Sequence, residues 1–199
     1  MSVHHHHAGH DDHGHEADPA KKDFSKRVAV LISVLAALLA VVEMGGKNAQ
    51  NTALISNQDA ANFWNFFQAK TIRMTTLRTA AEQSEVEGTL ASPAEAEKRA
   101  QQVAKWKATA QRYNDEPDTG EGRKQLAARA KAAEKKRDHA LAAYHNFEFG
   151  SAAFQLAIVL ASASVVTGVM ALAFVAGGLG VIGTGLALLG WFAPMLLHL

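Results

Sequence analysis

Apolar and charged positions are segregated along this chain. No Asp, Glu, Lys or Arg occurs from Phe149 to Leu199, and a shorter uncharged run extends from Val28 to Val42. Nearly all of the charge lies in the segment from Ala17 to Glu148. Long uncharged runs of this kind are typical of membrane-spanning helices. The pattern therefore predicts an all-α integral membrane protein, with three transmembrane helices and a coiled-coil-like extramembrane helical hairpin.

The C-terminal uncharged run is too long for one transmembrane helix. As a single helix, residues 151–199 would extend about 73 Å, whereas the hydrocarbon core of a bilayer is about 30 Å thick. The glycine-rich segment Ala176–Gly180 is the obvious place for the chain to turn. We therefore expect a second transmembrane helix at residues 151–175 and a third at residues 179–197.

A first transmembrane helix is expected at residues 28–46. Its strictly uncharged part is only about 22 Å long, so the helix must extend to Gly46 and include Glu43 near its end. Glu43 precedes Lys47 by four residues, which is the favoured order for a helical ion pair. We interpret Glu43 as an interfacial residue, with a functional acid inside the membrane as the alternative. Gly45 and Gly46 are expected to mark a hinge or a helix end.

Residues 47–150 are expected to form the extramembrane hairpin. Its first arm runs from about Lys47 to Glu87 without a proline. Its apolar positions, together with one lysine stem, alternate in spacing between four and three residues, as in the contact stripe of a coiled coil. The stripe consists of Phe63, Phe67, Lys70, Met74, Leu77 and Ala81. Three further apolar residues, Ile55, Trp64 and Phe66, widen it.

The return arm is predicted as two helices. Ser92-Pro93-Ala94-Glu95 is a capping box with proline at the first helical position, and the helix that it starts runs to about Tyr113. Asn114–Gly122 reads as a loop, and a third helix starts near Arg123. Because no proline follows until the C-terminal end, this helix is expected to run through Gly150 into the second membrane span. Its contact stripe is Leu126, Ala130, Ala133, Arg137, Ala140, Tyr144 and Phe147.

The polar N-terminal segment, residues 1–27, is expected to be disordered, because it has too little apolar surface to offset chain entropy. It holds a cluster of histidines with acidic neighbours. Imidazole suits Zn, Ni or Cu, and a flexible tail can wrap several rings around one ion. The alternative is a solvated, pH-responsive tail. The candidate metal ligands are His4, His5, His6, His7, His10, His13 and His15.

Composition narrows the function classes. The chain has 20 Lys and Arg against 19 Asp and Glu, interleaved, so a nucleic-acid partner is not expected. It has no cysteine, which excludes disulfides, thiolate metal sites and cysteine nucleophiles. His139 and His145 are six residues apart and do not share a helix face. We therefore expect no enzyme and no cofactor other than a metal ion at the tail.

The membrane segments contain small residues at four-residue spacing, in Ala157-x-x-x-Ala161, Ser164-x-x-x-Gly168 and Gly183-x-x-x-Ala187. Such patterns allow helices to approach closely, either within one chain or in a homo-oligomer. The leading hypothesis is a non-enzymatic, self-associating membrane scaffold or partner-binding protein. The alternative is a metal- or pH-responsive membrane sensor or channel-like homo-oligomer. Its expected partners are the lipid bilayer, a second copy of the chain and a membrane protein.

Flanking charge predicts the orientation. Lys21, Lys22, Lys26 and Arg27 precede the first span, whereas only Lys47 follows it closely. The positive-inside bias places the N-terminus in the cytoplasm and residues 47–150 in the periplasm. The expected location is therefore the bacterial inner (cytoplasmic) membrane, with several passes.

Two segments are similar to a known family. They are NFWNFFQAKTIR (Asn62–Arg73) and YHNFEFGSAAFQLAIVLAS (Tyr144–Ser162). Both resemble a bacterial family catalogued as domain of unknown function 4337, of which a short histidine-rich tail is also typical. The resemblance implies a three-span membrane protein with a helical insert, and it implies no activity. In the first segment, Lys70 and Arg73 are either an anion or lipid-headgroup site beside Trp64, or cations whose stems pack on the stripe with their charged ends in water.

Overall fold

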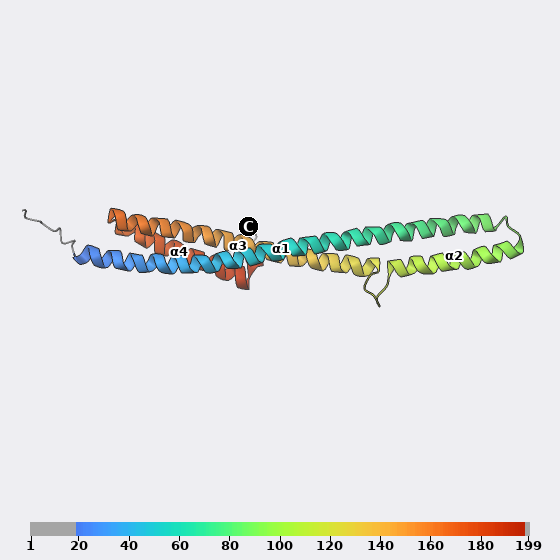
Figure 1. Ribbon diagram of the computed structural model, residues 1–199, viewed down its shortest axis with the longest axis horizontal. Helices are drawn as coiled ribbons and strands as arrows, with labels where there is room; N and C mark the ends of the chain where they lie inside the picture. The colour runs from blue at the N-terminus through green and yellow to red at the C-terminus, as the bar shows by residue number, and fades with distance from the viewer. Residues whose placement is uncertain (1–18, 198–199) are drawn as a thin grey trace, which may run out of the picture.

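The computed structural model describes residues 19–197, and within them every regular element is helical. Figure 1 shows a rod in which α1 runs along most of the length, α4 lies at one end, α2 lies at the other end, and α3 extends from the α4 end past the middle to the loop that joins it to α2. The all-α prediction is confirmed. The elements are α1 (Pro19–Gly88), α2 (Pro93–Asn114), α3 (Arg123–Thr167), α4 (Met170–Phe192) and a 3-10 turn, η1 (Pro194–Leu196).

The first helix is longer than predicted at its start. Residues 19–27 were expected to belong to a disordered tail, but α1 begins at Pro19. Apolar contact explains the difference, because the half-buried Phe24 packs against the hydrophobic core and extends the ordered helix ahead of Val28. Residues 1–18 lie outside the described part of the chain.

The expected hinge at Gly45 and Gly46 is absent, and α1 continues unbroken for 70 residues, about 105 Å. The two glycines make room for a neighbouring ring instead. A Cβ atom built on Gly45 would lie 3.1 Å from the Phe147 ring of α3. Buried positions on α1 recur every seven residues across this point, at Val28, Leu35, Val42, Ala49 and Ser56.

The return arm has the predicted division. The helix α2 starts at Pro93, where Glu95 accepts hydrogen bonds from the Ser92 backbone N–H and hydroxyl. After a loop, α3 runs from Arg123 through Gly150 without interruption, as expected. Of the predicted stripes, Lys70, Met74, Ala81, Leu126, Ala130, Ala140 and Phe147 are buried, while Ile55 and Phe66 are exposed.

The turn between α3 and α4 lies at Gly168 and Val169, so the prediction of a turn at Ala176–Gly180 is wrong. Gly168 ends α3 with φ of 73° and its N–H bonded to the Ser164 carbonyl oxygen. This left-handed conformation is one that glycine adopts without strain. The expected segments 151–175 and 179–197 are therefore replaced by the second part of α3 and by α4, which ends at Phe192 before Pro194.

The glycines of Ala176–Gly180, where a turn was predicted, lie inside α4. Three glycines of α4, Gly180, Gly183 and Gly190, lie where another helix comes close. A Cβ atom on Gly180 would lie 2.7 Å from Leu35 Cδ2, and one on Gly183 would lie 3.0 Å from the Phe154 ring. A Cβ atom on Gly190 would lie 3.0 Å from the Phe147 ring. The buried face of α4 is accordingly made of small residues, namely Ala176, Gly180, Gly183, Ala187 and Gly190.

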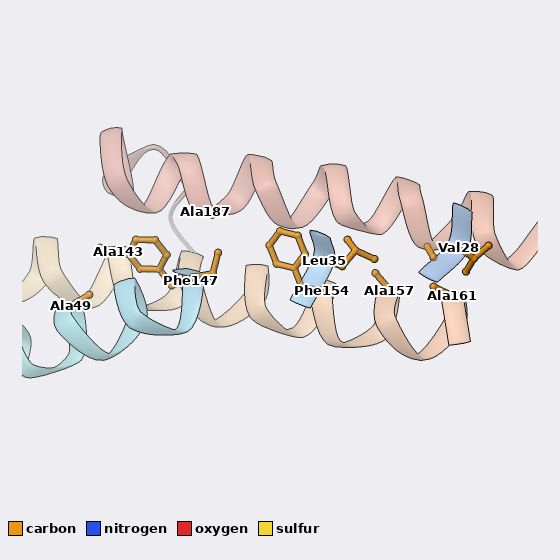
Figure 2. Packing of buried hydrophobic residues seen from close by; sticks show 11 residues of the cluster. Val28, Leu35, Ala49, Ala143, Phe147, Phe154, Ala157, Ala161 and Ala187 are labelled. Carbon is orange, nitrogen blue, oxygen red and sulfur yellow. The ribbon is translucent and has the colours of Figure 1, made fainter. Parts of the chain in front are cut away.

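The hydrophobic core lies where α1, α3 and α4 run together. Phe154, Ala157, Ala161 and Ala176 are completely buried, and Figure 2 shows Leu35 beside Phe154. We call this part, made of α1 up to Gly46, α3 from Phe149 and α4, the bundle. We call the remaining parts of α1 and α3, together with α2, the stalk.

Each of the three bundle helices is long and apolar enough to cross a membrane. Their outward faces are apolar as well: Val30 is 64% exposed, Phe174 is 74% exposed and Val181 is 73% exposed. Since the Phe147 ring lies against both Gly45 and Gly190, the stalk-side ends of the three uncharged stretches stand at one level.

Candidate functional site

The sequence-predicted metal ligands, His4, His5, His6, His7, His10, His13 and His15, lie outside the described residues. Within residues 19–197, no group of three side chains suited to a metal ion comes together. His139 is exposed, and His145 Nδ1 lies 3.7 Å from Glu148 on the same helix. Glu43 is exposed at the stalk end of the bundle.

The aromatic segment of α1 faces the start of α3, and three of its rings contact a charged partner there. The Arg129 guanidinium lies 4.3 Å from the Phe63 ring centroid, and that of Arg123 lies 4.7 Å from the Phe67 centroid. Trp64 Nε1 donates a 2.8 Å hydrogen bond to Glu134. Cation–π contacts and hydrogen bonds are directional, so they fix the register of α1 against α3.

Lys70 is the buried cation of this segment. Its side chain is 7% exposed, and Nζ lies 3.5 Å from Glu116 and 3.8 Å from Glu121. The rings of Phe66 and Tyr113 flank the ammonium group at 5.3 and 5.0 Å. Two carboxylates already neutralise this lysine, so it is not an anion site, and its charged end does not stand in open water. Arg73, by contrast, is exposed.

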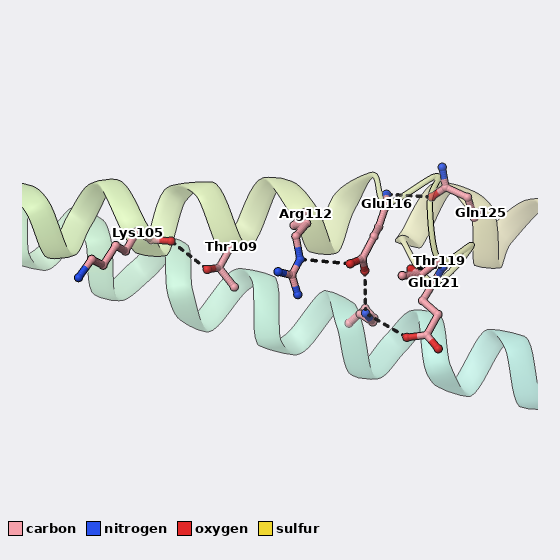
Figure 3. Close-up of polar contacts among 8 residues, drawn as sticks. Lys105, Thr109, Arg112, Glu116, Thr119, Glu121 and Gln125 are labelled. Carbon is pink, nitrogen blue, oxygen red and sulfur yellow. Dashed lines mark hydrogen bonds and ion pairs between the residues drawn. The ribbon is translucent and has the colours of Figure 1, made fainter.

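The ion pairs of Lys70 with Glu116 and Glu121 attach the loop between α2 and α3 to α1. Figure 3 shows Glu116 reaching Arg112, whose Nε lies 3.1 Å from the carboxylate. Arg123 Nε donates to Thr71 Oγ1 on α1 at 2.8 Å. A Cβ atom at Gly122 would overlap the Glu116 backbone nitrogen, so the loop closes only with glycine there. These contacts fix the position of the loop, and so of the break between α2 and α3, against α1.

Three carboxylates at helix ends in the stalk have pKa values below their ordinary values. The Ser92 hydroxyl lowers the pKa of Glu95 below its ordinary value of 4.5. The Lys124 ammonium, 2.7 Å away, and the Gln125 amide lower the pKa of Asp115 below 3.8. At the far end of the stalk, Arg99 lowers the pKa of Glu87 below 4.5. Each effect arises because a donor stabilises the ionised carboxylate.

A groove of about 480 Å³ opens between α1 and α3 near the base of the stalk. Leu54, Leu141 and Tyr144 line it, with Asn57 and Arg137 among its polar residues. Leu54 is 62% exposed and Leu141 is 38% exposed, and Arg137 donates to Asn57 Oδ1 at 3.3 Å. The sequence stripes did not identify this groove, because Leu54 lies outside the four-three spacing.

A second cavity, of about 340 Å³, lies between α3 and the C-terminal residues. Asn146 is 1% exposed, lines this cavity and donates to the Pro194 carbonyl oxygen at 3.1 Å. Next to it, the rings of Phe147 and Trp191 meet edge to face, 5.1 Å apart. These contacts hold the end of α4 on α3, where the bundle meets the stalk.

Comparison with known families gives a match over most of the chain. A family model described as "Domain of unknown function (DUF4337)" matches residues 24–193, which include nearly all of α1 and the whole of α2, α3 and α4. No curated protein and no solved structure matches the chain.

Proposed function

Because the chain belongs to the DUF4337 family, whose description names no activity, we propose its function from the geometry: it is a non-enzymatic membrane scaffold that self-associates through its stalk. In this proposal the bundle is the integral membrane part, with three transmembrane helices. The coiled-coil-like stalk stands on the bilayer as a helical hairpin.

The dimensions of the bundle suit a bilayer. The uncharged stretch of α3 from Phe149 to Thr167 is about 28 Å long, and the 23 residues of α4 extend about 34 Å. In α1 the uncharged stretch between Arg27 and Glu43 is about 22 Å long, and it reaches about 28 Å when it is extended to Gly46. These lengths bracket the hydrocarbon thickness of about 30 Å, so lipid covers the exposed apolar side chains around the bundle.

Helix continuity makes the stalk a rigid extension of the bundle. Both α1 and α3 pass from one part to the other without a break. The forty-two residues of α1 beyond Gly46 project the hairpin end about 63 Å from the bundle. A long rigid arm with fixed joints is suited to presenting a binding surface at a set distance from a membrane.

The exposed apolar groove at the base of the stalk is the main support for self-association. Leu54 lies eleven residues beyond Glu43, about 16 Å along α1. The headgroup layer on one side of a bilayer is only about 5–8 Å thick. Lipid therefore does not cover Leu54 and Leu141, and an exposed apolar groove with polar residues at its edge fits a helix of a second copy.

Single-cysteine cross-linking tests this proposal cleanly, because the chain has no cysteine of its own. Leu54→Cys in native membranes is expected to give a disulfide-linked dimer on mild oxidation. Asp59→Cys is the matched control: Asp59 is also exposed on α1, but it does not line the groove and lies about 140° further around the helix. Equal cross-linking of both variants, or a strictly monomeric detergent-solubilised protein by light scattering, would contradict the proposal.

The proposed location is the bacterial inner membrane, with the N-terminus in the cytoplasm and the stalk in the periplasm. The support is the basic cluster from Lys21 to Arg27 at the end of the bundle away from the stalk. A protease site inserted after the exposed Asp118 is expected to be cut in spheroplasts. Resistance at this site until the cells are lysed would reverse the orientation.

A further inference from the structure

An apolar groove runs along the bundle between α1 and α4. Both helices pack mainly on α3, and they contact each other only along a short seam that includes Leu35 and Gly180. On either side of Leu31, two adjoining cavities of about 340 and 440 Å³ open between them. Because Leu31 lines both cavities, they lie end to end along α1 and α4, and we call the pair the groove.

Glycine forms part of one wall of this groove. Gly177 and Gly185 of α4 line it, and a Cβ atom built on either would meet no atom within 4 Å. The space above these two glycines is therefore not used by the packing of the chain itself. Opposite them, α1 presents Val34 and Leu38.

Among residues 21–197, one charged side chain lines the groove, and it lies at one end. Arg27 shares the smaller cavity with Phe24, Met170 and Phe174. The neighbouring Lys26 lies 3.8 Å from Asp23, whereas Arg27 has no carboxylate partner among residues 21–197. Arg27 is also the last cation before the uncharged run of α1, at the height where lipid phosphates lie if the bundle spans a membrane.

We propose that this groove binds an anionic phospholipid, with the phosphate at Arg27 and an acyl chain along Leu31 toward Gly185. The inference rests on the proposed membrane insertion. A second copy fits the groove less well, because a chain in the same orientation places its own basic cluster at the same membrane face. Like charges would then meet at Arg27, whereas a lipid phosphate supplies the opposite charge.

The headgroup part of the proposal is tested by native mass spectrometry of the full-length protein. The probes are phosphatidylglycerol and phosphatidylcholine with identical acyl chains. Wild type is expected to retain phosphatidylglycerol preferentially, and Arg27→Gln is expected to reduce that preference about fivefold. Lys26→Gln removes the same charge from the adjacent residue, which does not line the groove, and it is expected to change the preference less than twofold. Equal losses in both variants would show delocalised attraction and would overturn the site.

The acyl-chain part is tested by filling the groove. Gly177→Leu is expected to reduce retention of both lipids. Gly178→Leu is the matched control, because Gly178 also has open space around it but does not line the groove. Equal retention in the two variants would overturn the proposal. So would a wild-type dimer that Gly177→Leu dissociates, since the groove would then hold a second copy.

Membrane insertion is measured separately on the same variants. A wild-type chain that leaves the membrane on alkaline carbonate extraction refutes the proposed membrane function itself. A chain that stays in the membrane but shows no difference between Arg27→Gln and Lys26→Gln refutes only the lipid site.

Discussion

Gly150 of α3 and Gly183 of α4 face each other so closely that a Cβ atom built on either would lie 3.1 Å from the carbonyl oxygen of the other. Backbone meets backbone here, with the Phe154 ring beside the contact. In the proposed lipid environment, where apolar burial does not favour helix association, such close approach lets the two backbones gain van der Waals contact. The contact between α3 and α4 therefore depends on these two positions having no side chain.

Gly183→Ala is predicted to destabilise the bundle by about 1–3 kcal/mol, because backbone atoms must shift to admit the methyl group. Thermal unfolding of the detergent-solubilised protein, followed by circular dichroism, measures the effect. Gly178→Ala is the control, since its Cβ atom would meet nothing within 4 Å. That substitution is expected to stabilise α4 by up to about 1 kcal/mol through helix propensity. Equal changes in both variants would refute the close contact.

The turn between α3 and α4 gives a second prediction. Gly168 has φ of 73°, and an alanine in this left-handed conformation costs about 1–2 kcal/mol. Gly168→Ala should therefore lower the unfolding temperature. Gly177 lies inside a helix, so Gly177→Ala should raise it slightly. A turn at Ala176–Gly180 would reverse the two signs, which makes this pair of variants a direct test of the topology.

The wrongly predicted position of the turn between α3 and α4 shows which features the sequence could reveal and which it could not. Charge segregation located the three apolar stretches, and Ser92-Pro93 located the start of α2, because both signals are local. A glycine, in contrast, serves either a turn or a close contact, and local sequence does not distinguish these uses. Gly180 is glycine because Leu35 of α1 lies against it, and that residue is 145 positions away in the sequence.

The stalk site was predictable only in part, for the same reason. The heptad-like spacing correctly placed Lys70 on the inward face of α1. Its neutralising partners, Glu116 and Glu121, lie in a loop 46 or more residues further along, and nothing local to Lys70 indicates them. The groove at Leu54 also depends on how α1 and α3 meet, so it became visible only in the folded chain.

Lys70 gives a third prediction, in which removing the charge and removing its partner have different effects. Lys70→Met is expected to change the stability by less than about 1 kcal/mol, because Glu116 keeps Arg112 at 3.1 Å and the desolvation cost of the buried ammonium offsets the lost attraction. Glu116→Gln leaves the buried ammonium with only the more distant Glu121, and it should destabilise the stalk by about 1–3 kcal/mol.

Chemical unfolding of both variants and of the double variant measures this difference. The double variant should recover most of the stability lost in Glu116→Gln, because it has no buried cation left to neutralise. A double variant whose change in stability equals the sum of the two single changes would indicate that Lys70 and Glu116 act independently, contrary to their 3.5 Å separation.

The fourth prediction concerns acid. The pKa values of Glu95, Asp115 and Glu87 are lowered in the folded stalk, so the unfolded chain binds more protons in mild acid. Their contribution to stability is fully present above the ordinary values of 4.5, 3.8 and 4.5 and is lost as the pH falls through the lower, folded values. The free energy of unfolding should therefore be nearly constant near neutral pH and should fall below about pH 5.

Two substitutions separate this effect from general acid sensitivity. Lys124→Met removes the largest cause of the lowered pKa of Asp115, so it should weaken the stalk at neutral pH and flatten its decline in acid. Asp118→Asn removes a loop carboxylate that makes no ion pair among the described residues, and it should leave the profile unchanged. Denaturant unfolding at pH 7, 5, 4 and 3 distinguishes the two. A wild-type stalk whose stability is unaffected down to pH 3 would mean that these carboxylates are equally ionised in the folded and unfolded chains, and the helix-end contacts that lower their pKa values would then contribute nothing to the fold.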